Sequence, residues 1–195
     1  MSVSFSSIGG WLVRMLAFIL LGVVTAAVGE IQFSVFIRSD FQNFLGSVVF
    51  NSFYLFGVAL ISSLFVRLLG DRRLTVFCHL VLFGASGLMI EWFMIGNSPW
   101  AKPEASQVGM FAYWSCMALV PFICLHPDPC FKSLKRTIGA IALVYIALAL
   151  MAQGNFNAEF LFIYHIWSVI IGYSLLAFVC VAGYARTVSR CPKKG

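Results

Sequence analysis

Long apolar runs, separated by short polar turns, dominate this sequence. Apolar residues make up 61% of the 195 positions and charged residues only 10%, whereas soluble domains carry roughly a quarter charged residues. Such a chain has too few polar residues to cover a water-facing surface, so we expect its solvent to be a lipid bilayer. In lipid the backbone must satisfy its own hydrogen bonds, which leaves helices or a closed barrel. Because the runs are continuous rather than alternating, they predict helices.

The runs predict a single all-α transmembrane domain over residues 1–195. Each has about 20 residues or more, which is enough to cross a hydrocarbon core of roughly 30 Å. The six predicted spans cover residues 11–29, 44–67, 74–96, 107–126, 135–153 and 159–184. The first run also has features of a signal peptide, with Arg14 before the apolar stretch and small residues at 25–27. We interpret it as a span.

The basic residues lie at the ends of the runs, where they set membrane orientation. Eleven fall on one side of the predicted bundle: Arg14, Arg67, Arg72, Arg73, Lys132, Lys135, Arg136, Arg186, Arg190, Lys193 and Lys194. The other side has two, Arg38 and Lys102. This bias predicts that both termini are cytoplasmic, and the short loops favour a bacterial inner membrane. Because the basic residues lie at the ends of the spans, they do not form a surface patch for nucleic acid. The net charge of +6 therefore does not indicate a nucleic-acid partner.

The first predicted outer loop, residues 30–43, mixes apolar and polar positions, as in the run Gln32-Phe33-Ser34-Val35-Phe36. Two interpretations stay open. The loop is a short amphipathic element in the membrane interface, or it continues the first span.

The most unusual stretch is 84–114, because it places a carboxylate, Glu91, inside an apolar run. Counting residues from the outer ends of the spans puts Asn51, Tyr113 and His165 at the same depth, roughly 8–10 Å below the boundary. An ionisable residue inside a membrane is a candidate functional residue and tends to face the bundle interior. These four residues therefore predict a polar site that opens outward and binds a solute or a proton. The alternative is a structural pair of Glu91 and His165 that joins two helices.

Gly84-Ala85-Ser86-Gly87 and His165 resemble the serine motif and the helix-six histidine of the rhomboid intramembrane proteases, which also have six core spans. Ser168 and Gly172 follow His165 as small residues often do in that family. The resemblance implies Ser86 as a nucleophile and His165 as its base. The chain departs from the family because Ser86 lies on the third span, rising from the cytoplasm, rather than on the fourth. Small residues in this pattern are also typical of helix packing.

A third group of candidate functional residues lies at the cytoplasmic end of the fourth span. It consists of Cys124, His126, Asp128 and Cys130, which occur at every second position. These residue types are ligands for zinc or copper, although their spacing matches no standard zinc site. A turn with free thiols is the alternative. His79 and His165 lie at different depths, so they do not form a bis-histidine haem site, and single-histidine ligation stays open. The sequence names no cofactor.

Three functions are consistent with these observations. The first is binding or transport of a small solute, an ion or a proton through the outward polar site. Size and topology are similar to the solute-binding subunits of vitamin transporters that a partner ATPase powers, so a partner membrane subunit is part of this hypothesis. The second is a non-catalytic subunit of a larger membrane complex. The third is a membrane enzyme, with the intramembrane hydrolase as its sharpest version.

Overall fold

The computed structural model describes residues 8–37, 39–70, 72–102, 106–155 and 158–191, and regular structure in these ranges is helical throughout. Six helices are long and apolar enough to cross a membrane, which indicates an integral, multi-pass membrane protein and confirms the predicted helical class. They are α1 (Ile8–Glu30), α2 (Phe41–Leu69), α3 (Arg73–Ile90), α4 (Gln107–Cys124), α5 (Lys132–Asn155) and α6 (Ala158–Arg190). Three short helices complete the described structure: the π-helices η1 (Ile31–Ile37) and η2 (Glu91–Ile95), and the 3₁₀-helix η3 (Pro129–Phe131).

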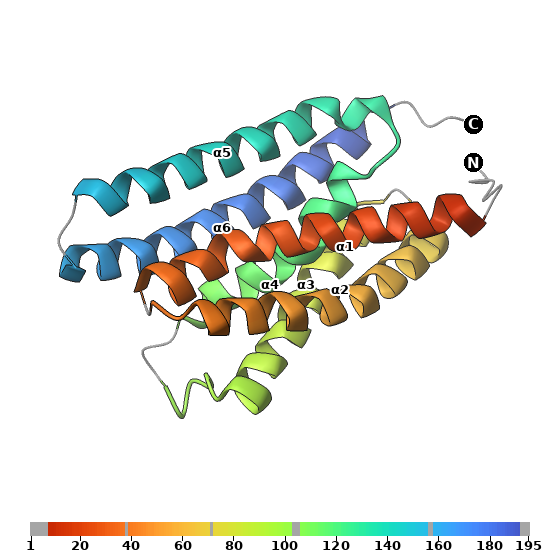
Figure 1. Ribbon diagram of the computed structural model, residues 1–195. Coiled ribbons are helices and arrows are strands. Elements are labelled where there is room, and N and C mark those ends of the chain that lie inside the picture. Colours follow the sequence, from red (N-terminus) through yellow and green to blue (C-terminus); the bar gives the residue numbers. More distant parts are fainter. Residues whose placement is uncertain (1–7, 38, 71, 103–105, 156–157, 192–195) are drawn as a thin grey trace.

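The helices run side by side as one bundle, with the two ends of the chain at the same end (Figure 1). A hydrogen bond from the Arg73 guanidinium to the Ser189 hydroxyl joins the start of α3 to the end of α6 there. The connection between α4 and α5 also lies at this end (Figure 1). The end of the bundle that holds the start of α1, the end of α6 and this connection is called the terminal end. The opposite end is called the polar end.

The first predicted loop is a continuation of α1 rather than a separate element on the surface. Helix η1 begins directly after Glu30, and its Gln32 and Ser34 side chains are buried. The chain then turns at Ser39, where φ is 54°, and Asp40 caps α2 by accepting a hydrogen bond from the Asn43 amide. The apolar positions of 31–37 therefore extend the first membrane helix, as the second of our two interpretations states.

Helix α4 is the centre of the bundle. Every residue from Ala112 to Ile123 is buried, whichever side of the helix it occupies. A helix that is apolar on all sides is expected in the interior of a membrane bundle or a large core. The other helices pack around α4, and α1, α3 and α6 each have extensive contact with it. Their outer faces carry the exposed apolar side chains that a lipid environment requires.

Small residues allow α3 to approach α4 closely. A Cβ atom added at Gly84 would lie 2.5 Å from both the Phe111 ring and the Ser115 hydroxyl. A Cβ atom at Gly87 would overlap the Trp114 side chain from its Cβ atom to its indole ring. Gly84 and Gly87 thus form a packing surface for α4, as close helix contact in a membrane favours. Because Gly87 has no side chain, the surface of α3 has a notch there, and the Trp114 side chain fits into it.

Gly87→Ala is expected to destabilise the bundle, because the new methyl group overlaps Trp114 and forces α3 away from α4. Overpacking of this kind costs about 1–3 kcal/mol. Thermal unfolding in detergent would measure the loss. Gly57→Ala is the matched control, since a Cβ atom there meets no atom within 4 Å and alanine favours a helix over glycine. Equal melting temperatures for the two variants would show that the notch does not hold the helices together.

Candidate functional site

Two glutamates occupy equivalent places in the chain, each at a junction between an α-helix and a π-helix. Glu30 is the last residue of α1, before η1, and Glu91 is the first residue of η2, after α3. A π-turn widens the helix by one residue and frequently occurs at functional sites. Both junctions lie toward the polar end of the bundle. Glu91 is buried, with 8% of its surface exposed, and Glu30 is half-buried.

The Glu91 carboxylate accepts hydrogen bonds from two neutral donors. The Trp114 indole N–H donates to one oxygen at 3.1 Å, and the Asn97 side-chain amide donates to the other at 2.7 Å. The backbone fixes Asn97, because its amide donates to the Glu91 carbonyl at 2.8 Å after a left-handed turn at Gly96. Lys102 reaches the Asn97 side-chain oxygen at 2.9 Å rather than the carboxylate. Within the described part of the chain, Glu91 is therefore held by neutral donors.

The Glu30 carboxylate has a similar set of partners. The Tyr113 hydroxyl donates to one oxygen at 3.0 Å, and the Ser34 hydroxyl donates to the other at 3.4 Å. Ser34 in turn accepts a hydrogen bond from the Asn43 side chain at 2.9 Å. Because Tyr113 gives its hydrogen to Glu30, its oxygen is the acceptor for the Asn51 amide at 3.4 Å. Glu30 is thus tied to α4 directly and to α2 through Tyr113.

Adjacent residues of α4 connect the two glutamates. Tyr113 binds Glu30 and Trp114 binds Glu91, so one short piece of helix presents donors to both carboxylates. Among the described residues, neither carboxylate has a lysine, arginine or histidine within ion-pair distance. We call Glu30, Glu91, Tyr113, Trp114 and Asn51 the carboxylate site.

Aromatic rings surround the donors. Trp114 meets Tyr54 edge-on, with the ring centroids 4.9 Å apart, and it meets Phe50 in the same manner at 6.5 Å. Tyr113 packs edge-on against Tyr173 at 5.1 Å, and the Tyr173 hydroxyl donates to the Thr25 carbonyl of α1. These contacts fix the two buried donors, and a hydrogen bond among apolar groups is electrostatically stronger than one in water.

The structure brings together three of the four residues that the sequence predicts for the outward site. Asn51 and Tyr113 share a hydrogen bond, and Glu91 is joined to them through Trp114. The fourth, His165, lies on α6, but its side chain is outside the described residues, so the predicted contact with Glu91 stays a prediction. Sequence reasoning missed Glu30 as a member of the site, because the apolar run appeared to end there. Glu30 and Ser34 are one helical turn apart, and this spacing is the feature of the sequence that indicates a helix continuing past Glu30.

The other serine and histidine candidates have structural partners. The Ser86 hydroxyl donates to the Phe83 carbonyl at 3.1 Å and lies 2.9 Å from the Tyr54 hydroxyl. The base that the rhomboid resemblance implies is His165, and its side chain is outside the described part of the chain. Among the described residues, Ser86 is therefore a polar link between α2 and α3.

His79 is fully buried between α2, α3 and α4, and both of its ring nitrogens are engaged. Nδ1 lies 2.7 Å from the Thr75 carbonyl, which can only accept, so Nδ1 carries the hydrogen. Nε2 is then the acceptor for the Ser62 hydroxyl at 2.7 Å. The ring stacks on Phe122 with the centroids 4.2 Å apart. His79 is a neutral core residue, with no nitrogen left to bind a haem iron.

The predicted metal candidates at the terminal end do not form one set. His126 is buried against Phe131, with ring centroids 3.8 Å apart, and its Nδ1 accepts a hydrogen bond from the Asp128 amide. Asp128 and Cys130 instead lie close to Cys191, at the end of α6. Cys124 and His126 are not part of this group.

The link between α1 and α4 at the carboxylate site is expected to show in a double-mutant cycle of Tyr113→Phe and Glu30→Gln. Tyr113→Phe removes the hydrogen bond between the two residues, and Glu30→Gln removes the negative charge that strengthens it. The double variant therefore loses the charge-assisted part of the interaction only once. Directly contacting residues couple by about 0.5–3 kcal/mol. Unfolding free energies of the four proteins in detergent give this coupling, and strictly additive losses would contradict the contact.

Ser62→Ala is expected to destabilise the protein, because it leaves the buried Nε2 of His79 without a donor. An unsatisfied buried polar group costs about 1–3 kcal/mol. The neighbouring Ser63→Ala is the control, since that hydroxyl only bonds the Ala59 carbonyl of its own helix. Thermal unfolding of both variants tests this, and similar losses would argue against a structural role for the serine–histidine pair.

We compared the chain with protein-family models, with curated proteins and with solved structures. No family model matches it, and neither a curated protein nor a solved structure does. The residues of the carboxylate site, with their donors and their burial, therefore carry the functional argument.

Proposed function

We propose that this protein binds a proton or a small cation at the carboxylate site and moves it, alone or with a small solute, across the membrane. The observation that supports this most strongly is the pair Glu30 and Glu91. Two acidic groups lie within one apolar bundle, bind adjacent residues of α4, and receive hydrogen bonds only from neutral donors among the described residues. Ionisable residues in such places commonly mark ion pathways and proton relays.

The chemistry of the pair favours a positive ligand. Two carboxylates that share an apolar site repel each other when both are charged, and a single shared proton or cation relieves that repulsion. Each carboxylate has two neutral donors of its own, which stabilise a negative charge by their dipoles without neutralising it. A proton or cation would supply that neutralisation, and a carrier would alternate between the loaded and the empty state. Asn51 and Asn97 add polar groups with which a co-transported solute could hydrogen-bond.

The distribution of basic residues supports an assignment of the side of the membrane toward which the carboxylate site opens. Most of them lie at the terminal end, and the positive-inside rule places such an end in the cytoplasm. The carboxylate site would then open toward the outside, beneath the turn between η2 and α4. Short connections and this charge bias support a bacterial inner membrane as the location.

The remaining hypotheses predict different behaviour of the same residues. In a non-catalytic subunit of a larger complex, Glu30 and Glu91 would serve only to join helices, and their exchange for glutamine would not affect ion binding. In a hydrolase, Ser86 rather than the glutamates would be essential, and Ser86→Ala would abolish function. The carboxylate pair favours the first hypothesis, because joining helices does not require two interacting acids.

Infrared difference spectroscopy during a pH titration tests the binding step. We expect the purified protein to show a carboxyl C=O stretching band that appears as the site takes up a proton. Glu30→Gln and Glu91→Gln should each remove or shift this band. Addition of Na⁺ or K⁺ at constant pH would show whether a metal cation displaces the proton.

Asp40→Asn is the matched control for the titration. Asp40 is an exposed carboxylate in the same part of the chain, and asparagine caps a helix as well as aspartate does. The control should keep the band of the wild-type protein. Identical titrations for the wild type and both glutamine variants would refute the proposal.

Transport is measured in proteoliposomes that contain a pH-sensitive dye, with a potassium diffusion potential as the driving force. The wild type and Asp40→Asn should acidify the vesicle interior at equal rates. Glu30→Gln and Glu91→Gln should slow this acidification, because each removes one of the two acids. If the glutamine variants acidify the vesicles as fast as the wild type, the carboxylate site is not on the proton path.

A further inference from the structure

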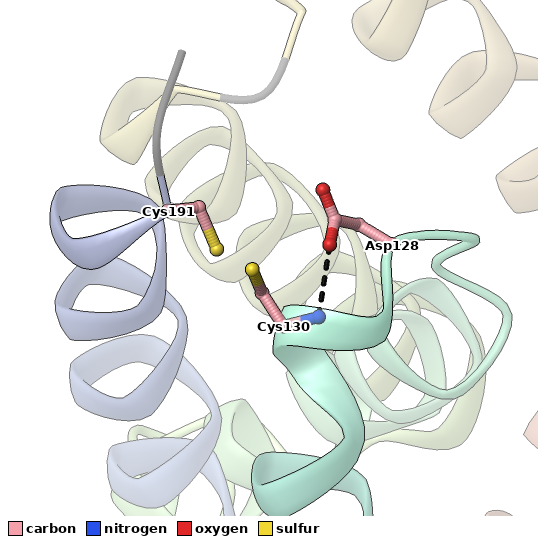
Figure 2. A group of neighbouring side chains, drawn as sticks. All are labelled: Asp128, Cys130 and Cys191. Atoms are coloured by element: carbon pink, nitrogen blue, oxygen red, sulfur yellow. Dashed lines mark hydrogen bonds between the residues drawn. The ribbon is translucent and has the colours of Figure 1, made fainter. Parts of the chain in front are cut away.

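Three potential metal ligands come together at the terminal end of the bundle, at the other end of α4 from the carboxylate site. They are the Asp128 carboxylate, the Cys130 thiol and the Cys191 thiol, and their ligand atoms all lie within 4.8 Å of one another. Figure 2 shows the two sulfur atoms pointing toward each other, with the carboxylate beside them. Asp128 and Cys130 come from the connection between α4 and α5, whereas Cys191 directly follows α6.

The local structure holds this group in place. Asp128 caps η3, because one of its carboxylate oxygens accepts a hydrogen bond from the Cys130 amide at 2.8 Å (Figure 2). The next residue, Phe131, is buried and packs against Tyr184 of α6, with ring centroids 5.0 Å apart. This contact docks the connection on α6 and brings Cys130 beside Cys191. The position of the three ligands is therefore built into the fold.

The ligand set and its spacing fit a thiophilic ion. In a tetrahedral zinc site, Zn–S bonds of about 2.3 Å and Zn–O bonds of about 2.0 Å place the ligand atoms about 3.5–3.8 Å apart. The observed spacing of up to 4.8 Å needs a contraction of about 1.3 Å at most to meet this geometry. Cys130 is exposed and the other two ligands are half-buried, so an ion can enter from water. Three protein ligands leave a fourth position for water or another ligand.

We propose that Asp128, Cys130 and Cys191 form a three-ligand site for Zn²⁺ at the terminal end of the bundle. Two thiolates and a carboxylate carry three negative charges, and a divalent cation offsets most of them. Both thiols lose their protons to the solvent as the ion binds. The bound ion fastens the end of α6 to the connection between α4 and α5. Since one position stays open, the ion is exchangeable rather than permanently enclosed.

Cobalt substitution of the full-length protein in detergent tests this site directly. Co²⁺ bound by thiolates absorbs strongly through sulfur-to-cobalt charge transfer, so the wild type should develop this absorption with one equivalent. Zn²⁺ should then abolish it by displacement. Cys130→Ser and Cys191→Ser should each weaken Zn²⁺ binding by at least about tenfold, a loss typical of damaged metal sites. Zn²⁺ should also raise the melting temperature of the wild type, because it binds only the folded state.

Two further variants separate the proposed ligands from their neighbours. Asp128→Asn keeps the cap on η3 but removes the charge, so it should weaken Zn²⁺ binding while the protein stays folded. Cys124→Ser changes a nearby half-buried thiol outside the group and should bind as the wild type does. The proposal is refuted if the wild type gives no charge-transfer absorption, or if Cys124→Ser weakens binding as much as Cys130→Ser. A disulfide between Cys130 and Cys191 in protein isolated from cells would also refute it.

Discussion

The close contact of α3 with α4 is the interaction on which the rest of the structure depends. In a membrane the lipid tails are as apolar as the side chains, so helices associate through tight packing and through hydrogen bonds between them. Gly84 and Gly87 provide both, because they allow Trp114 and Ser115 of α4 to approach the α3 backbone. The Ser115 hydroxyl then lies within hydrogen-bond distance of two carbonyl oxygens, 2.9 Å from that of Leu80 on α3 and 2.8 Å from that of Phe111 on α4, and its single hydrogen is shared between them. With α4 fixed in this way, α1 and α6 close around its remaining faces.

The same contact determines where the carboxylate site lies. Trp114 fills the notch at Gly87, and its indole N–H consequently points to Glu91, one helical turn further along the chain at the start of η2. Its neighbour Tyr113 then faces α1 and α2, where Glu30 and Asn51 are its partners. Packing and polar recognition thus use adjacent residues of one helix. A shift of α4 relative to α3 would alter both carboxylates together, which is a physical route for coupling an ion to a movement of helices.

The two polar regions of the molecule differ in the way they meet the solvent. Glu91 and the donors Tyr113 and Trp114 are buried where aromatic rings pack, and Glu30 is half-buried beside them. The group of Asp128, Cys130 and Cys191 lies at the opposite end, and its Cys130 is exposed. The first region therefore has its polar groups within the contacts between helices, whereas the second has them within reach of water.

The sequence alone determined that the chain forms six apolar helices, because run length and composition decide whether a segment can satisfy its backbone in lipid. It also identified Glu91, since a carboxylate within an apolar run is visible without a structure, and it placed Asn51 and Tyr113 at the same depth by counting residues. It did not identify Glu30, which ends an apolar run and so resembled a loop residue until η1 continued the helix. Only the tertiary structure joined Glu30 to Glu91 through Tyr113 and Trp114, and Cys130 to Cys191. These pairings depend on which faces of the helices meet, and that choice follows from the shape of close-packed side chains rather than from the pattern of apolar residues along the chain.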